Sequence, residues 1–326
     1  MMTRAGCTHD GDMRREPERG RALEGRVGSR DQARLFGVLG DPVDHSLSPA
    51  MQNAAFAAVR LPHIYLRYRV PVGALPRAVQ EAKALRMGGL NLTVPLKEAI
   101  LPLLDGVDPG AARIGAVNTV VFGPDGRAVG HNTDGEGFLR AIRGRVRIAG
   151  ARALIIGAGG SARAVGTALA GAGCASITIA NRTVARAERL AARLAALGTS
   201  AVAVPLSALT RGEALEDATL VVNTTPVGLA GARLDVRWAA TRPRCLFVDL
   251  VYAARPTPFL LGAARARRST LDGSAMLLHQ GALAFEAWTG RRAPRRAMAR
   301  ALRIAGLALT EPAAAATVAA RRPPTR

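Results

Sequence analysis

The chain contains few aromatic residues and little cysteine, and each shortage narrows the possible functions. Phe, Trp and Tyr make up only 4% of the 326 residues, so few side chains are available to stack on nucleic-acid bases. The three cysteines, Cys7, Cys174 and Cys245, lie far apart and have no spacing typical of a disulfide framework or metal site. We therefore expect no metal and a reducing, cytoplasmic location.

Long apolar segments are also missing. No run of 18 apolar residues occurs, and the first 20 residues lack the apolar core of a signal peptide. We therefore expect no membrane partner. The polar residues 1–33 and the C-terminal residues 309–326 show no periodicity that would indicate packed structure, and we expect both segments to be disordered tails.

Acidic residues are scarce, and this leaves a formal net charge of +21. Such an excess can indicate a nucleic-acid partner. The basic residues are spread along the whole chain, however, and no familiar nucleic-acid-binding module is present. We expect no nucleic-acid partner, and keep salt-dependent nucleic-acid binding as an alternative.

Lysine is the rarest of the basic residues. Only two of the 45 Lys and Arg residues are lysine, and one of them, Lys97, follows the strand-like segment GGLNLTVP. Arginine keeps its proton near neutral pH, whereas lysine can release a proton where its surroundings lower its pKa. Lys97 is therefore a candidate for proton transfer, the alternative being a surface lysine after Pro95.

Strand and helix patterns alternate between the two tails, which predicts an α/β fold with parallel sheets. The segment IYLRYRV alternates with Ile64, Leu66, Tyr68 and Val70 on one face, which predicts a half-buried strand with that face inward. The segments AVNTVVF and AVGHNTD are separated by the turn sequence PDG, which predicts a pair of adjacent strands.

A glycine-rich loop follows the apolar segment ALII and precedes a helical pattern. Its sequence GAGGSA places Gly157, Gly159 and Ala162 in a G-x-G-x-x-A pattern, with Gly160 between them. Glycine lets the backbone approach a pyrophosphate at the N-terminus of the following helix. The pattern therefore predicts dinucleotide binding, and a purely structural glycine turn is the alternative.

The next predicted strand ends in a basic segment. Most NAD sites place Asp or Glu about 20 residues after the glycine loop, but no acidic residue occurs between Ser161 and Ala187. The strand ends instead in Asn181, Arg182, Thr183 and, one turn later, Arg186. Because guanidinium groups suit a 2′-phosphate, we predict NADP as the cofactor. Ordinary surface arginines are the alternative.

Four short segments carry small hydroxyl and amide side chains together with one possible Lys/Asp pair. The segments are HSLSP (45–49), NLTVPLK (91–97), AVNT (116–119) and NTDG (132–135). A polyhydroxylated acid needs such matched donors and acceptors when it is buried. We therefore predict a small polar substrate.

With these segments the chain resembles the shikimate dehydrogenase family from about residue 34 to residue 305. The resemblance also includes GAGGSARA, NRTVARAERL, VNTTPVG (222–228), VDLVYAARPTPFL (248–260) and DGSAMLLHQGALAF (272–285), all in the family's order. Ser274 stands where we expect a leucine. The resemblance implies reversible NADP-linked reduction of 3-dehydroshikimate to shikimate in chorismate and aromatic amino-acid biosynthesis.

The resemblance also assigns roles to individual residues. It implies that Lys97 and Asp134 form the catalytic pair. It implies that the substrate contacts, besides this pair, are Ser46, Ser48, Thr93, Asn118, Tyr252 and Gln280. It implies that the cofactor contacts are Gly157, Ala158, Gly159, Gly160, Ser161, Ala162, Asn181, Arg182, Thr183, Arg186, Thr225, Pro226, Gly228, Val251, Gly273 and Met276.

Alternative interpretations remain for several of these side chains. Asp134, Ser46 and Ser48 are also suited to cap helices. Tyr252 is suited to packing, and Gln280 to a solvated helix face.

The predicted organisation has two domains. We predict a Rossmann-type NADP-binding domain over residues 136–273. We predict an α/β substrate-binding domain with a mainly parallel sheet over residues 34–135 and 274–308. The chain is expected to be a monomer or homodimer. Quinate or aminoshikimate dehydrogenase activity, or an NADP-binding sensor without turnover, are the alternatives.

Overall fold

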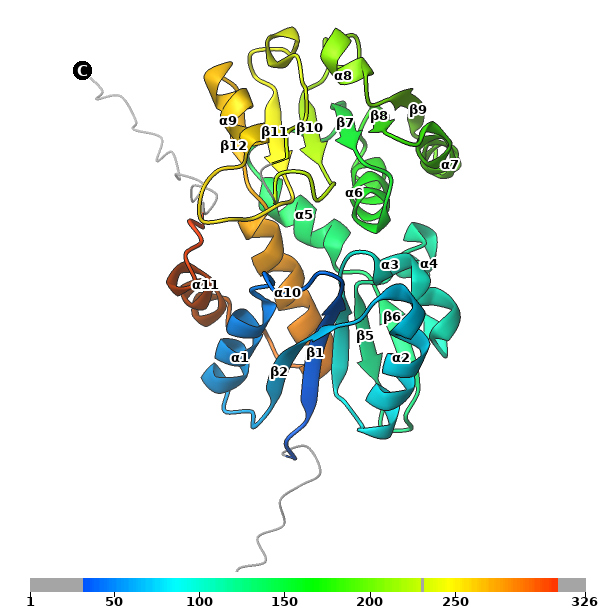
Figure 1. The fold of residues 1–326 in the computed structure, drawn as a ribbon, viewed down its shortest axis with the longest axis vertical. Coiled ribbons are helices and arrows are strands. Elements are labelled where there is room, and N and C mark those ends of the chain that lie inside the picture. Colours follow the sequence, from blue (N-terminus) through cyan, green and yellow to red (C-terminus); the bar gives the residue numbers. More distant parts are fainter. Residues whose placement is uncertain (1–31, 230–231, 310–326) are drawn as a thin grey trace, which may run out of the picture. The chain divides into compact units, whose positions relative to one another are not determined.

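The computed structural model describes residues 32–229 and 232–309. The two predicted tails therefore lie outside the described residues, except for residues 32, 33 and 309. The described residues form an α/β fold with two six-stranded sheets (Figure 1). Among the described residues, no helix is long and apolar enough to cross a membrane.

The first sheet is mixed and has the strand order β2-β1-β3-β5-β6-β4. Its strands are β1 (Leu35–Gly40), β2 (Ile64–Arg69), β3 (Gly89–Leu92), β4 (Gly106–Val107), β5 (Thr119–Phe122) and β6 (Ala128–His131). Strand β1 is parallel to both of its neighbours, and β5 and β6 form an antiparallel pair. This confirms the predicted pairing of the two segments around the PDG turn.

Helices cover both faces of the first sheet. They include α1 (Ser48–Ala58), α2 (Leu75–Ala84), α3 (Leu96–Ala99) and α4 (Pro109–Ile114), with 3₁₀ turns at Val72–Ala74 and Leu101–Leu103. Helix α5 (Asp134–Ile142) follows β6, but its buried residues pack in the core of the second sheet. Phe36 and Val38 of β1 pack on the side of α1, whereas Leu39 packs on the side of α2. Strand β1 is therefore buried on both faces, as expected for a central strand between helices.

The predicted facing of the IYLRYRV strand is wrong at its first residues. Ile64 and Leu66 are 51% and 42% exposed, whereas Tyr65 is fully buried. Strand β2 lies at the edge of the sheet, and Tyr65 packs into the core beneath α1. On the opposite face, the core beneath α2 reaches only Tyr68 and Val70, so the start of that face stays exposed.

The second sheet is parallel throughout and has the order β12-β11-β10-β7-β8-β9. Its strands are β7 (Arg152–Ile156), β8 (Ser176–Asn181), β9 (Ser200–Pro205), β10 (Leu220–Asn223), β11 (Leu246–Asp249) and β12 (Ser269–Leu271). Ala153 and Ile155 pack in one core, and Leu154 and Ile156 pack in the core on the other face. The continuous apolar run of β7 therefore reflects burial on both faces.

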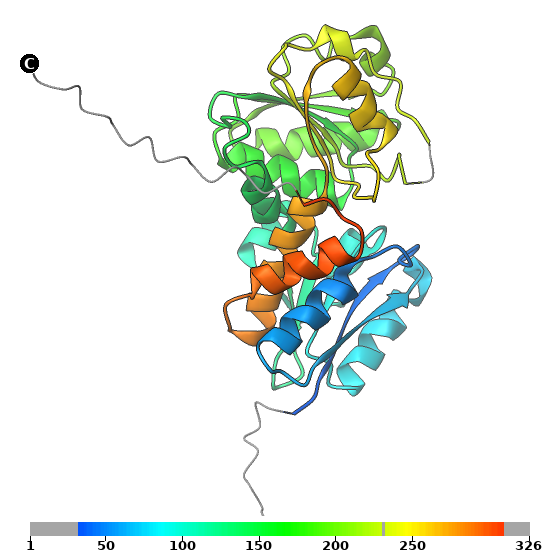
Figure 2. The ribbon, with the colours of Figure 1, turned by 90° about the vertical axis from the view of Figure 1, so that its left-hand side faces the viewer.

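The remaining helices follow the strands of the second sheet or return to the first. They are α6 (Gly160–Gly171), α7 (Val184–Ala195), α8 (Ala208–Arg211), α9 (Pro258–Arg265), α10 (Ser274–Thr289) and α11 (Arg295–Ile304), with a 3₁₀ turn at Trp238–Ala240. Figure 2 shows α11 beside α1 and α10. Met276 of α10 belongs to the core of the second sheet, and Phe285 belongs to the core of the first. Helix α10 therefore packs against both sheets.

Candidate functional site

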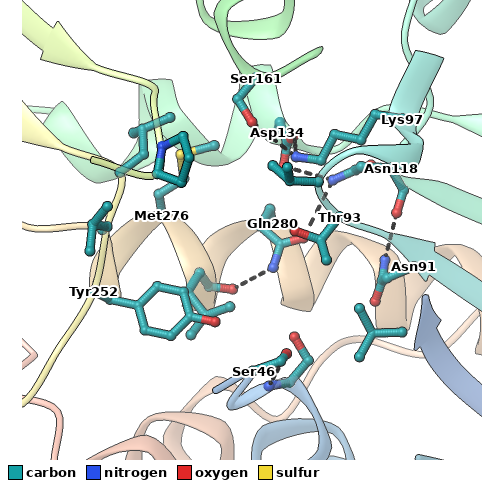
Figure 3. Close-up of a pocket in the computed structure, with 18 of the residues that line it drawn as sticks. Ser46, Asn91, Thr93, Lys97, Asn118, Asp134, Ser161, Tyr252, Met276 and Gln280 are labelled. Carbon is teal, nitrogen blue, oxygen red and sulfur yellow. Dashed lines mark hydrogen bonds and ion pairs between the residues drawn. The ribbon is translucent and has the colours of Figure 1, made fainter. Parts of the chain in front are cut away.

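A cavity of about 260 Å³ opens beyond the carboxyl ends of strands from both sheets. This is where ligands bind in open α/β sheets. All eight residues predicted to contact the substrate line it, namely Ser46, Ser48, Thr93, Lys97, Asn118, Asp134, Tyr252 and Gln280. Several of them are labelled in Figure 3. Segments far apart in the sequence therefore contribute to one wall.

Lys97 and Asp134 form a partly buried ion pair in this cavity. The Lys97 Nζ lies 2.5 Å from Asp134 Oδ2, and the two side chains are only 12% and 5% exposed. Lys97 is in α3, just after β3, and Asp134 is the first residue of α5, just after β6. Lys97 Nζ also donates to Ser161 Oγ at 3.0 Å. Because an ammonium group carries three protons, one remains for a ligand in the cavity.

Asn118 orients the carboxylate of this pair. Its Nδ2 donates to Asp134 Oδ1 at 2.8 Å, and its Oδ1 accepts from the backbone N–H of Thr133 at 2.8 Å. Both carboxylate oxygens of Asp134 therefore have a donor. Thr133, and not Asp134, is the N-cap residue of α5. The geometry thus directs the Asp134 carboxylate toward Lys97 rather than toward the helix backbone.

The opposite side of the cavity carries hydroxyl groups (Figure 3). Ser46 and Ser48 are both buried, and Leu47, the N-cap residue of helix α1, makes no side-chain capping hydrogen bond. Ser46 Oγ accepts from the backbone N–H of Ser48 at 3.4 Å, so the Ser46 hydroxyl also contacts the start of this helix. Burial raises the pKa of the Tyr252 hydroxyl, and hydrogen bonds involving Leu47 and Ser46 partly offset the effect. Tyr252 also packs against the core beneath α1, so it combines packing with a polar contact in the cavity.

Gln280 projects into the cavity from α10. Its Oε1 accepts from Asn118 Nδ2 at 3.4 Å, and its Nε2 donates to the Leu277 carbonyl at 3.0 Å. The side chain is therefore part of the polar network around Asp134 rather than a member of a solvated helix face. Thr93, just after β3, lines the same cavity (Figure 3).

A second cavity of about 410 Å³ lies along the glycine loop and reaches the end of β8. Gly157 has φ +108°, a conformation that favours glycine, and a Cβ added there would lie 2.5 Å from Thr224 Oγ1. A Cβ added at Gly159 would meet nothing within 4 Å, so this part of the loop is open. The loop ends at the N-terminus of α6, whose N–H groups suit a pyrophosphate.

Most of the residues predicted to contact the cofactor line one of the two cavities. Those lining the second are Gly157, Ala158, Gly159, Gly160, Ser161, Asn181, Arg182, Arg186, Thr225 and Pro226. Val251, Gly273 and Met276 line the first. Ala162, Thr183 and Gly228 line neither cavity: Ala162 is buried in the core of the second sheet, and Thr183 is the N-cap residue of α7.

The two cavities have a common wall. Lys97 and Ser161 line both, as do Thr224, Thr225 and Pro226 after β10. A cofactor in the glycine-loop cavity and a small molecule in the other would therefore meet beside the Lys97 ammonium. Within the described residues, no group of three or more His, Cys, Asp or Glu side chains is placed to hold a metal ion.

Sequence reasoning missed two features of the site. Glu98, next to Lys97, lines the glycine-loop cavity and forms ion pairs with Arg163 and Arg186. The buried Tyr65 donates from its hydroxyl to Asn91 Oδ1 at 2.7 Å, behind the cavity wall. The sequence signal for Glu98 was its position beside the candidate catalytic Lys97. The two arginines that pair with Glu98 could not be predicted, because both are more than 60 residues away in the sequence.

Ser274, which departs from the expected leucine, has a local role in the structure. Its side chain is fully buried, and its hydroxyl donates to Asp272 Oδ1 at 2.5 Å. The backbone N–H of Ser274 donates to the same oxygen at 3.1 Å. The substitution is therefore accommodated by polar contacts at the start of α10.

Three family models together match most of the described chain. The model described as shikimate dehydrogenase substrate binding domain matches residues 38–120. The model described as shikimate / quinate 5-dehydrogenase matches residues 140–250. The model described as shikimate 5′-dehydrogenase C-terminal domain matches residues 273–303.

Individual proteins are similar over nearly their full length. Shikimate dehydrogenase (NADP(+)) of Moorella thermoacetica is 50% identical over 82% of this chain and 92% of its own. A crystal structure of shikimate 5-dehydrogenase from Thermus thermophilus with NADP(H) and shikimate is 42% identical, with a TM-score of 0.72 over 83% of this chain and 99% of its own. Quinate dehydrogenase from Corynebacterium glutamicum in complex with NAD is 32% identical, with a TM-score of 0.75 over 83% and 99% of the two chains.

Proposed function

Because this chain belongs to the shikimate dehydrogenase family, we propose that it catalyses the reversible, NADP-dependent reduction of 3-dehydroshikimate to shikimate. This reaction serves the synthesis of chorismate and the aromatic amino acids. The observation that carries the proposal is the Lys97–Asp134 ion pair, placed where the glycine-loop cavity meets the cavity lined by hydroxyl and amide groups.

The glycine-loop cavity fits a dinucleotide with a 2′-phosphate. Gly157, Gly159 and the N-terminus of α6 suit the pyrophosphate, and Arg182 and Arg186 lie at the far end of the cavity. When bound, NADPH supplies the hydride for the substrate ketone. Thr225 and Pro226 belong to the wall that the two cavities share, and Met276 of α10 lines the cavity for the substrate.

Lys97 moves the proton of the reaction. As an ammonium ion it stabilises the negative charge that develops on the substrate carbonyl oxygen, and it donates the proton that completes the alcohol. Asp134 fixes the position of Nζ and accepts a hydrogen bond from the neighbouring substrate hydroxyl. In the direction of oxidation, neutral Lys97 takes the proton back from the alcohol.

The remaining residues hold the substrate in a single orientation. Ser46, Ser48 and Tyr252 line the cavity and offer hydroxyl donors to the substrate carboxylate. Ser46 and Tyr252 lie on the side of the cavity away from Lys97 (Figure 3). Thr93, Asn118 and Gln280 bind the ring hydroxyls. Because unpaired buried polar groups are costly, this set discriminates against analogues with a missing or additional hydroxyl.

A spectrophotometric assay of the purified protein tests the proposal. NADPH oxidation is followed with 3-dehydroshikimate and with 3-dehydroquinate, and each measurement is repeated with NADH. We expect rapid turnover only with NADPH and 3-dehydroshikimate. Preference for 3-dehydroquinate would assign the protein to quinate metabolism, and tight NADPH binding without any turnover would favour a sensor.

Three broader predictions accompany this function. We propose that residues 136–273 form the NADP-binding domain, with residues 34–135 and 274–308 as the substrate-binding domain. We propose a cytoplasmic location, which is supported by the buried, unpaired thiols of Cys174 and Cys245. We propose that the chain is a monomer or homodimer, which analytical ultracentrifugation can measure.

A further inference from the structure

Glu98 links the catalytic helix to the edge of the cofactor cavity. It follows Lys97 in α3, and its Oε2 lies 2.7 Å from Arg163 Nη2 of α6. Its Oε1 lies 3.7 Å from Arg186 Nη2 of α7. One carboxylate from the first part of the chain thus contacts two helices of the second sheet.

The two arginines at the far end of the cavity differ in their surroundings. Arg182 and Arg186 both line it, as does Glu98. Arg186 is paired with Glu98, whereas Arg182 has no ion pair within residues 32–229 and 232–309. A 2′-phosphate arriving at this end therefore finds Arg182 available and Arg186 partly neutralised.

A phosphate near Arg186 and the Glu98 carboxylate carry charges of the same sign. Both groups require the same guanidinium donors of Arg186. Because the two negative charges would lie close together at a partly exposed site, each weakens the binding of the other. Arg163 holds Glu98 at this position through the shorter of its two ion pairs. Burial lowers the pKa of Arg163, and the charge of Glu98 opposes that effect. Glu98 therefore helps to keep the Arg163 guanidinium charged.

We infer that Glu98 competes with the 2′-phosphate for Arg186, and that it thereby limits the preference of the protein for NADP over NAD. Glu98 is a specificity-determining residue that acts through Arg186. The inference rests on the proposed cofactor. It goes beyond the assignment of Arg182 and Arg186 to the 2′-phosphate. It states that an acidic residue outside the basic segment also affects the affinity for the cofactor.

The test is a binding measurement on the full chain by calorimetry, with NADP⁺ and NAD⁺ as ligands. The variant Glu98→Gln removes the charge but keeps an oxygen that can accept from Arg163. We expect its Kd for NADP⁺ to fall about two- to fivefold, the factor that corresponds to a partly exposed ion pair, and its Kd for NAD⁺ to stay unchanged. Glu81→Gln, which breaks an exposed pair between two residues that line neither cavity, Glu81 and Arg77, is the control for net charge and should change neither Kd.

A double variant tests whether the effect passes through Arg186. In an Arg186→Ala background, Glu98→Gln should no longer change the Kd for NADP⁺. Equal tightening of NADP⁺ and NAD⁺, weaker binding of NADP⁺, or an undiminished effect without Arg186 would each overturn the inference.

These measurements do not depend on turnover. If the Kd values change as expected but the protein does not reduce 3-dehydroshikimate, the proposed reaction is wrong and the inference stands. Absence of NADP⁺ binding would sink both.

Discussion

The Lys97 ammonium and the Asp134 carboxylate lie 2.5 Å apart although 37 residues separate them in the sequence. Each follows directly on a strand of the first sheet, β3 for Lys97 and β6 for Asp134, and β5 lies between these two strands. Asn118, the residue before β5, donates from its amide to the Asp134 carboxylate and holds it in place. Three adjacent strands thus hold the two residues in position. Replacement of Lys97 is therefore expected to remove the proton donor and to leave the fold intact.

Replacement of Lys97 tests the proton-transfer role. Lys97→Ala is expected to fold normally and to lose roughly 10²- to 10⁴-fold in kcat, because the carbonyl oxygen then lacks its general acid. The chain offers a matched control in its only other lysine. Lys83 forms a surface ion pair with Asp105 at 2.7 Å, and Lys83→Ala should leave kcat unchanged. Near-normal turnover of the Lys97 variant would rule out the mechanism.

Ser161 is expected to position Lys97 from the cofactor side. Its Oγ accepts from Lys97 Nζ at 3.0 Å, so Ser161→Ala leaves the ammonium held by Asp134 alone. We expect kcat at saturating NADPH to fall about fivefold, which corresponds to one hydrogen bond of about 1 kcal/mol. Ser161→Thr keeps the hydroxyl and should restore most of the rate. If only the KM for NADPH changes, Ser161 serves the cofactor and not Lys97.

Arg182 is expected to read the 2′-phosphate. Arg182→Ala should raise the KM for NADPH much more than the KM for NADH, because only NADPH loses a charge-assisted hydrogen bond. Arg189→Ala is the matched control, since Arg189 is an exposed residue of α7 that does not line either cavity. Equal losses for the two cofactors would argue against a role in phosphate recognition.

The sequence located the residues of the candidate site better than it located their contacts with one another. The glycine loop and the basic segment after β8 could be located because each motif is local and follows a strand with a clear apolar pattern. The α/β fold and the hairpin around PDG were predictable for the same reason. The pairing of Glu98 with Arg186 was not predictable, because it depends on how α3 of the first sheet lies against α7 of the second sheet.

The facing of β2 shows the same limit. Alternation told which residues share a face, but the burial of Tyr65 depends on where α1 covers the sheet edge. That coverage is a property of packing between distant segments, and a short alternating pattern at an edge strand carries no information about it.

Asp249 gives the protein a pH-dependent element beside the cavity wall. It is fully buried at the end of β11. It accepts from Asn223 Nδ2 at 2.9 Å, from the Val251 N–H at 3.1 Å and from Thr257 Oγ1 at 2.5 Å. Burial raises the pKa of this carboxyl to about 6, although these hydrogen bonds lower it. Asp249 thus ties together the segments after β10 and β11, and both segments contribute to the cavity wall.

The raised pKa of Asp249 predicts how stability varies with pH. Because folding favours the protonated form, the stabilisation is fully present below the unfolded pKa of 3.8 and is lost as the pH rises through about 6. Urea unfolding of the native chain and of Asp249→Asn should show the difference in their unfolding free energies falling by about 2 kcal/mol between pH 4 and pH 8. Asp217→Asn is the control, since a hydrogen bond from Arg242 lowers the pKa of Asp217 below 3.8 and its contribution is lost only at more acidic pH, so the difference for this variant should hardly change between pH 4 and pH 8. A difference for Asp249→Asn that stays constant over this range would show that the Asp249 carboxyl titrates alike in the folded and unfolded chains.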